Sequence, residues 1–429
     1  MSNTVPYGWS IGNLTDFSDV NPRLVQRSAM NADTPVSFIK MEDVSNNAVV
    51  RNIRTASYGQ VSKGFTSFQN GDVLVAKITP CFENGKGGFV QGLRNGVGFG
   101  STEFHVLRAR KNSSPKFLYQ LTNSEDFRLK GAVNMTGSAG QRRVPTEYLK
   151  TLEIAFPPLP EQKKIAAILS SVDEVIEKTR AQIDKLKNLK TGMMQELLTK
   201  GIGPGGVPHT EFKDSPVGHI PSEWNLSSLE ELSSFITSGS RGWAQYYSAS
   251  GAIFIRIGNL TRGHINLRFV DTVYVNPPDS AEGKRTKVQS GDVLISITAD
   301  LGVIGVVNKS MGEAYVNQHI SLVRLIEPEL ARWVGHFLAF ENTQKQFIAN
   351  NDAGAKAGLN LTAIRKTLVA LPPTDERVLI VDSLDSIDQA ISMKRVKLLE
   401  IQDLKKALMQ DLLTGKVRVK VDTRELAEA

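Results

Sequence analysis

Two long segments of the chain carry a narrow apolar stripe among charged residues. Apolar side chains recur at steps of three and four through residues 165–197 and again through residues 380–412. This spacing is typical of helices that pair in a coiled coil. Each segment follows a proline pair and ends at a glycine, Gly201 or Gly415, and both features mark helix boundaries. The predicted seam residues are Ile165, Leu169, Val172, Ile176, Ile183, Leu186, Leu189, Met193, Leu197, Ile380, Leu384, Ile387, Ile391, Leu398, Ile401, Leu404, Leu408 and Leu412.

The second of these segments repeats the first. Between Phe156–Lys200 and Leu371–Gly415, 16 of 45 positions are identical without a gap, at an offset of 215 residues. The repeat extends upstream, because Trp9 aligns with Trp224 at the same offset, and "QNGDVLV" at Gln69 aligns with "QSGDVLI" at Gln289 at an offset of 220 residues. Self-similarity over this length predicts two copies of one structural unit.

The regions between the long helices contain signals for both strands and helices. The runs "GDVLVAKI", "GDVLISIT", "VSFIKMEDV" and "AIFIRIGNL" are typical of buried strands, and "KFLYQLTNSEDFRLK" and "RWVGHFLAFENTQKQFI" of amphipathic helices. We predict an α+β protein with two tandem mixed α/β globular domains, residues 1–155 and 206–370. Residues 156–205 and 371–429 supply two long helices that pair as an antiparallel coiled coil, giving a pseudo-two-fold internal repeat. The alternative is that each helix packs only on its own domain.

Composition indicates a folded, cytoplasmic protein with an anionic partner. The chain has 429 residues, 41% of them hydrophobic and 22% charged, and a net charge of +7. Residues 1–155 carry 18 basic and 12 acidic side chains. A basic first domain favours nucleic acid as a partner, although a basic solvated surface would look the same. The single cysteine, Cys81, excludes an intramolecular disulfide. The absence of a long apolar run predicts no membrane association.

Motifs for catalysis are weak throughout the sequence. "NPPD" at Asn276–Asp279 resembles the Asn-Pro-Pro-aromatic motif of amino-methyltransferases, but an aspartate replaces the aromatic residue. "FENGKGGF" lacks the spacing of a phosphate-binding loop and is typical of a hairpin turn. Asp72 and Asp292 follow glycines and are interpreted as turn residues. The six histidines show no metal-ligand spacing. We predict no catalytic residue and no metal site in this chain.

Recognition of DNA remains as the function that the charges favour. Arginine and lysine in glycine-rich loops bind phosphates, and arginine also reads base edges in the major groove. For each candidate, the alternative is an ordinary solvated charge. The predicted DNA-binding residues are Lys40, Lys63, Lys77, Lys86, Arg142 and Arg143 in the first domain, and Arg241, Arg256, Arg262, Lys284, Arg285, Lys287 and Lys356 in the second.

The order of motifs resembles one known family along essentially the full chain. The diagnostic strings are "PPLPEQKKIA" from Pro157 to Ala166, "GHIPSEW" from Gly218 to Trp224, and the paired helix ends "MMQELLTKG" and "LMQDLLTGK". They resemble the specificity (S) subunit of type I restriction–modification systems. The second helix departs from the pattern, because "PPTDERVLIV" lacks the glutamine and the alanine.

The resemblance implies a division of labour with other subunits. It implies two target recognition domains, each reading one half of a bipartite, asymmetric target in double-stranded DNA. The helices would be both the spacer and the scaffold for two methyltransferase (modification) subunits, with restriction/translocase subunits added. S-adenosylmethionine, ATP and Mg would be used by those partners, and this chain would bind no cofactor. Two other hypotheses are a coiled-coil assembly adaptor that reads no DNA sequence, and a fused methyltransferase based on "NPPD".

Overall fold

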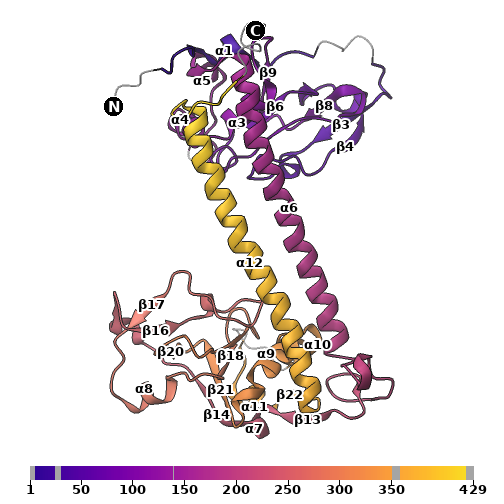
Figure 1. The fold of residues 1–429 in the computed structure, drawn as a ribbon, viewed down its shortest axis with the longest axis vertical. Coiled ribbons are helices and arrows are strands. Elements are labelled where there is room, and N and C mark those ends of the chain that lie inside the picture. Colours follow the sequence, from indigo (N-terminus) through magenta and orange to yellow (C-terminus); the bar gives the residue numbers. More distant parts are fainter. Residues whose placement is uncertain (1–4, 25–29, 139, 350–357, 422–429) are drawn as a thin grey trace. The chain divides into compact units, whose positions relative to one another are not determined.

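The computed structural model describes residues 5–24, 30–138, 140–349 and 358–421, and the chain divides into two compact units (Figure 1). Unit 1 comprises residues 1–180 and 396–429, and unit 2 comprises residues 181–395. Each unit contains one mixed domain and parts of two long helices, α6 (Leu159–Leu197) and α12 (Thr374–Leu413). The predicted tandem arrangement of two mixed domains and two long helices is therefore confirmed.

Both long helices begin and end where the sequence predicts. They start directly after the Pro157–Pro158 and Pro372–Pro373 pairs, because proline suits a first helical turn. The glycines that follow them, Gly201 and Gly415, have φ angles of +64° and +72°. This left-handed conformation favours glycine at a helix C-terminus.

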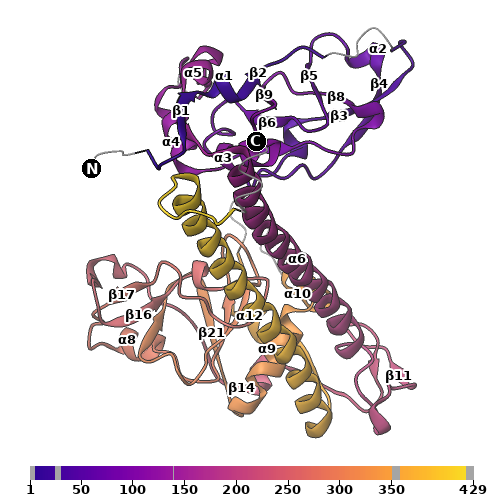
Figure 2. The ribbon, with the colours of Figure 1, turned by 45° about the horizontal axis from the view of Figure 1, so that its top comes forward.

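Within each unit the two helices run antiparallel (Figure 2). In unit 2, Lys394 donates to Gln182 at 2.8 Å, and Lys190 contacts Asp388 at 2.6 Å, so rising numbers on α6 meet falling numbers on α12. In unit 1, the start of α6 shares a buried cluster with the end of α12. In each unit the helices also pack on the domain. The predicted helix pairing and the alternative, packing of a helix on a domain, therefore occur together.

Most predicted seam residues are buried or partly buried, but two are not. Leu189 and Leu404 are 55% and 54% exposed. In both helices the following residue, Lys190 or Lys405, turns inward instead and meets an aspartate of the other helix. The predicted stripe is therefore wrong at Leu189 and Leu404, because a paired lysine occupies the inward position that a leucine was expected to fill.

The domain of unit 1 consists of two four-stranded sheets and a short strand pair. One sheet is antiparallel, and in the other β3 and β8 run parallel. Helices α3 and α4 replace the single helix predicted there, because the Ser124 hydroxyl accepts from the Phe127 amide and starts a new helix. The elements are β1 (Ser10–Asn13), α1 (Leu14–Phe17), β2 (Ser18–Val20), β3 (Pro35–Ile39), β4 (Arg54–Ser57), α2 (Tyr58–Val61), β5 (Thr66–Gln69), β6 (Val73–Ala76), β7 (Gly87–Phe89), β8 (Val97–Gly100), β9 (Phe104–Ala109), α3 (Pro115–Thr122), α4 (Glu125–Val133), α5 (Thr146–Thr151) and β10 (Glu153–Phe156).

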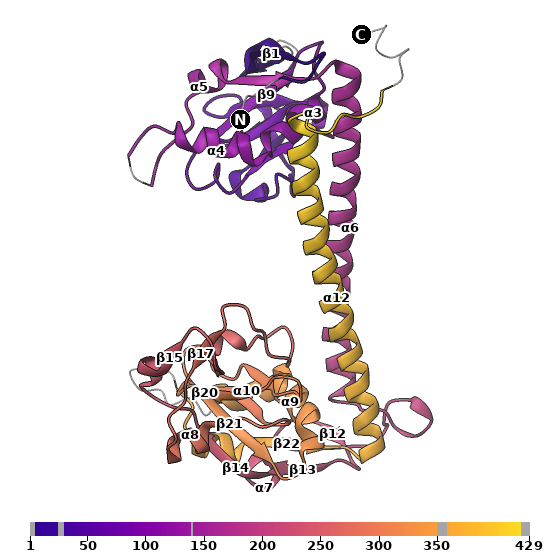
Figure 3. The same cartoon turned by 60° about the vertical axis from the view of Figure 1, so that its left-hand side comes forward.

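The domain of unit 2 repeats this plan with local differences (Figure 3). The sheet order β14-β21-β18-β19 matches β2-β9-β6-β7, and the parallel pair β16–β20 matches β3–β8. The short helix α2 before β5 in unit 1 corresponds in chain order to α8 in unit 2, and strand β5 is reduced there to one antiparallel bridge between Lys287 and Tyr315. The elements are β11 (Phe212–Lys213), β12 (Ile220–Pro221), β13 (Asn225–Ser228), α7 (Leu229–Leu232), β14 (Ser233–Ser238), β15 (Tyr247–Ser248), β16 (Ala252–Ile255), β17 (Val273–Val275), α8 (Ala281–Thr286), β18 (Val293–Ser296), β19 (Ile304–Val306), β20 (Ala314–Val316), β21 (Ile320–Leu325), α9 (Ala331–Ala339), α10 (Glu341–Ala349), α11 (Leu361–Lys366) and β22 (Leu368–Leu371).

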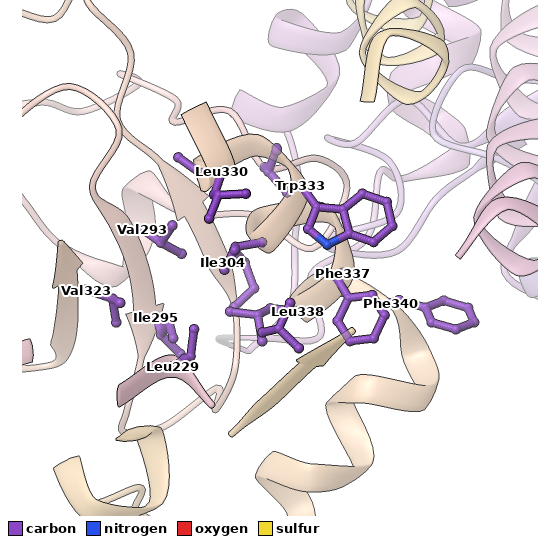
Figure 4. Close-up of a cluster of buried hydrophobic side chains, with 14 of the residues drawn as sticks. Leu229, Val293, Ile295, Ile304, Val323, Leu330, Trp333, Phe337, Leu338 and Phe340 are labelled. Atoms are coloured by element: carbon purple, nitrogen blue, oxygen red, sulfur yellow. The ribbon is translucent and has the colours of Figure 1, made fainter. Parts of the chain in front are cut away.

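The core of unit 2 joins its sheet to the long helices. Leu330, just before α9, and Leu338 of α9 lie on the side of the apolar strands β18 and β19 (Figure 4). The Trp333 indole instead donates to the Ala370 carbonyl of β22. The same cluster includes Ile380 and Leu384 of α12, both fully buried. Domain and helices therefore share one hydrophobic core, which holds the domain on its scaffold.

Candidate nucleic-acid interface and its scaffold

Three predicted DNA-binding residues of unit 1 gather at the end of strand β6. The Thr79 amide donates to the Arg142 carbonyl at 2.9 Å, and the Val144 amide donates to the Lys77 carbonyl at 2.9 Å. Arg143 pairs with Glu103 at 2.9 Å, and this guanidinium lowers the pKa of the Glu103 carboxyl. Arg143 therefore fixes the loop, while the neighbouring Arg142 is half exposed.

The remaining candidates of unit 1 lie apart from that group. Lys86 donates to the Met41 carbonyl at 3.1 Å, and Lys40 lies 3.6 Å from Glu42. Lys63 is exposed just after α2. The structure therefore gives Lys40 and Lys86 local partners within their own domain.

Four candidates of unit 2 gather around the short helix α8. Lys284 and Arg285 belong to this helix, and Lys287 follows it and pairs with Glu313 at 2.6 Å. The Arg241 amide donates to Glu282 of the same helix at 3.3 Å. Because the short helix α2 at the equivalent place in unit 1 contains no lysine or arginine, this basic cluster is a feature of unit 2.

The other candidates of unit 2 are held separately. Arg262 contacts Asp300 at 2.5 Å and Gln344 at 3.2 Å. Arg256 donates to the Asp271 carbonyl at 3.2 Å. Lys356 lies outside the described residues. Positive charge in unit 2 is thus distributed differently from that in unit 1.

Asp72 and Asp292 have the same structural role in the two domains. Each accepts from a backbone amide three residues earlier, Gln69 at 2.8 Å or Gln289 at 2.7 Å, as a turn residue does. Each also forms a two-bond ion pair, Asp72 with Arg108 and Asp292 with Arg324. Sequence reasoning missed the arginines, because nothing local marks a partner more than 30 residues away.

The two units share a tryptophan–glutamate contact at the start of each long helix. The Trp9 indole donates to Glu161 at 3.1 Å in unit 1, and the Trp224 indole donates to Glu376 at 3.1 Å in unit 2. Both carboxylates are buried, at 2% and 6% exposure. Each glutamate therefore joins the first strand region of its domain to the start of a long helix.

A basic side chain and a glycine complete each of these contacts. Arg418 pairs with Glu161 at 2.7 Å in unit 1, and His209 lies 3.2 Å from Glu376 in unit 2. A Cβ on Gly415 would lie 3.1 Å from the Trp9 ring, and one on Gly201 would lie 2.8 Å from the Trp224 ring. Each repeated helix end is thus packed against the tryptophan of its own unit.

The "NPPD" segment lies in the loop between β17 and α8. Asp279 there is 3.4 Å from Lys284, and both side chains are exposed. Among the residues described, no three histidine, cysteine, aspartate or glutamate side chains gather as a metal site would require. Within that same part of the chain, no helix combines the length with the apolar character that a bilayer crossing needs.

Comparison with known proteins finds the same repeat. The type I restriction modification DNA specificity domain matches residues 6–188 and again residues 221–403. The EcoAI type I restriction enzyme specificity subunit from Escherichia coli is 36% identical over 191 residues, which cover 43% of this chain and 32% of that protein. The match thus spans about a third of that relative's length.

Other relatives extend the similarity over nearly the whole chain. The MjaX type I restriction enzyme specificity subunit from Methanocaldococcus jannaschii is 29% identical over 428 residues, covering 97% of this chain and 95% of that protein. The crystal structure of the S subunit of a type I restriction–modification system from M. genitalium shares the fold, with a TM-score of 0.57 at 15% identity over 96% of this chain and 97% of that one.

Proposed function

The chain belongs to the type I restriction modification DNA specificity family, and from this premise we propose that it is the DNA sequence-recognition subunit of a type I restriction–modification complex. The domain that defines the family occurs twice, and each copy includes a mixed domain and a long helix. This duplication is the observation that carries the proposal. It also favours DNA recognition over a plain assembly adaptor, because an adaptor needs no second recognition domain.

The target is a bipartite, asymmetric sequence in double-stranded DNA, with one half-site for each domain. Shared scaffold contacts support two readers of one design, while the different basic clusters support two different half-sites. In unit 1 the cluster is Lys77, Arg142 and Arg143, and in unit 2 it is Arg241, Lys284, Arg285 and Lys287. Arginine and lysine at such places bind phosphates and read guanine.

The helices supply the spacer and the scaffold for partner subunits. Two methyltransferase (modification) subunits bind the helices, and restriction/translocase subunits join the complex. The chain catalyses no reaction and holds no cofactor, while S-adenosylmethionine, ATP and Mg serve the partners. The repeat supports two copies of one partner, because the helices of the two units present equivalent strings such as "LKTGMMQELLTKG" and "LKKALMQDLLTGK".

Methylation mapping tests the proposal. DNA from cells with and without the gene is compared by single-molecule sequencing, with the partner genes present in both strains. We expect adenine methylation at a split motif with two unlike halves, present only when the gene is present. Methylation that does not depend on the gene, or a gene-dependent motif without a gap, would contradict the proposal.

A further inference from the structure

One side chain of α6 in unit 2 contacts both the other long helix and the domain. The Lys190 ammonium lies 2.6 Å from the Asp388 carboxylate of α12 and donates to the Gly263 carbonyl of the domain at 3.0 Å. The Lys190 and Asp388 side chains are 11% and 2% exposed. We call this set the unit 2 junction.

Unit 1 contains an equivalent set, the unit 1 junction. The Asp173 carboxylate of α6 contacts the Lys405 ammonium of α12 at 2.6 Å and accepts from the Gln120 amide of helix α3 at 2.8 Å. Gln120 is fully buried. Asp173 and Asp388, like Lys190 and Lys405, are the same residue type 215 positions apart. The two junctions therefore use the repeated pair with the two helices exchanged.

These ion pairs, buried in unit 2 and partly buried in unit 1, account better for the position of the helices than for stability. Desolvation of two charges offsets most of their attraction, so a well-packed apolar pair is often as stable. A buried polar pair nevertheless permits only one alignment, because any shift leaves a charge without its partner. A third contact to the domain extends that restriction from the helices to the domain in each unit.

We propose that the two junctions are positioning elements that determine how strictly the protein selects the length of the gap between half-sites. This inference rests on the proposed function, since only a reader of a split target has a gap to select. Each junction fixes the alignment of the helices within its unit and the position of the domain on those helices. One base pair advances the duplex by about 3.4 Å and rotates it by about a tenth of a turn. A domain held less firmly on the helices would therefore let the protein accept a gap one base pair longer or shorter.

The test measures methylation by the complex of this chain with its methyltransferase subunits. The substrates are duplexes that carry the mapped half-sites with gaps one base pair shorter, native, or one base pair longer. The unit 2 variant is Lys190→Leu with Asp388→Leu, and the unit 1 variant is Gln120→Met, which leaves the Asp173–Lys405 pair in place. We expect both to lower the preference for the native gap about tenfold, while thermal unfolding shifts little.

Two controls separate this effect from general damage. Lys187→Leu with Asp184→Leu changes an exposed pair on the same helix, which has a separation of 2.9 Å, and should leave gap preference unchanged. Exchanging the charges, Lys190→Asp with Asp388→Lys, keeps the ion pair between the helices but removes the donor to the Gly263 carbonyl, so it should restore only part of the preference that the leucine pair loses.

The outcomes distinguish the inference from the function on which it rests. Junction variants that fold and keep the native gap preference would overturn the inference and leave the proposed function intact. If the variant with Lys190→Leu and Asp388→Leu fails to fold, the unit 2 pair serves stability and the inference is overturned for unit 2. The Gln120→Met variant then decides the inference for unit 1. A wild-type complex that methylates all duplexes equally, with or without the half-sites, would contradict the proposed function itself.

Discussion

Units 1 and 2 share the contacts between the long helices and the domain, but they differ in where basic side chains lie on the surface. In both units a buried glutamate accepts a hydrogen bond from a tryptophan, and an aspartate–lysine pair joins the two long helices. The short helix α2 of unit 1, which has no basic residue, corresponds in unit 2 to helix α8 with its basic cluster. The comparison indicates that the scaffold was kept after duplication while the recognition surfaces diverged.

The junctions also differ in burial, and this sets the expected sizes of mutational effects. The unit 2 aspartate, Asp388, is 2% exposed, whereas Asp173 of unit 1 is 28% exposed. Unit 2 further contains the histidine His336 at the helix position where unit 1 has Gln120. The aspartate–lysine pair between the long helices is therefore less exposed to solvent in unit 2 than in unit 1.

The largest effect is expected from removing the tryptophan of unit 2. Trp224 is fully buried and packs edge-on against Trp333, with 5.5 Å between the ring centroids, whereas Trp9 is 7% exposed. Trp224→Ala should lower the free energy of unfolding by about 4 kcal/mol, and Trp9→Ala by less. Chemical denaturation followed by circular dichroism measures both. Equal losses would show that the two contacts are energetically equivalent.

A somewhat smaller effect is expected from neutralising the junction aspartates. Asp388→Ala leaves the Lys190 ammonium buried without its carboxylate and should cost about 3 kcal/mol. Asp173→Ala should cost about 1 kcal/mol, because water reaches this pair more easily. Urea unfolding of the two variants measures how much free energy of unfolding each one loses, and hence the ratio of the two losses. A larger loss for Asp173→Ala would reverse the order of burial on which the comparison rests.

Acid should destabilise unit 2 through His336. Burial lowers the pKa of this histidine, although its hydrogen bond to Asp385 partly opposes the effect. The unfolded chain therefore binds the proton more readily, so stability falls as the pH drops below the ordinary histidine value of about 6.5. His336→Gln, which copies Gln120 of unit 1, should reduce the loss of stability between pH 7 and pH 5 by about 1 kcal/mol. Melting temperatures at both pH values test this, and an unchanged difference would contradict the assignment.

The smallest effect concerns single phosphate contacts. Arg142 is 48% exposed, 3.9 Å from Glu83. If it contacts a DNA phosphate, Arg142→Ala should lower the slope of log affinity against log salt by about 0.9, with little change in folding. Fluorescence anisotropy of the complex on its target duplex measures the slope. Lys150→Ala, which removes an exposed charge paired with Glu147, is the matched control.

Periodicity and repetition were enough to predict the architecture. Proline pairs, terminal glycines and steps of three and four placed α6 and α12 correctly, because these signals act within a few residues. The buried strands β6 and β18 followed from apolar runs after Gly-Asp. The inward-facing Lys190 and Lys405 could not be read from hydrophobicity, since a lysine is buried only when a distant aspartate meets it. Their identity in both copies was the available signal.

The DNA-binding candidates were harder to choose from sequence. Arg143 and Arg262 look like free cations in flexible loops, but Glu103 and Asp300 bind them within the domain. Such pairs join residues 40 and 38 positions apart, so local pattern does not reveal them. Contact of Lys77, Arg142 and the α8 cluster with DNA stays a prediction.

Exchange of one recognition domain tests the central claim most directly. Residues 1–155 are replaced by the corresponding domain of another family member, and the methylated motif is mapped by single-molecule sequencing of cellular DNA. The account predicts that one half-site changes while the other half-site and the gap stay the same. A change in both half-sites, or in neither, would contradict the view that two independent readers share one scaffold.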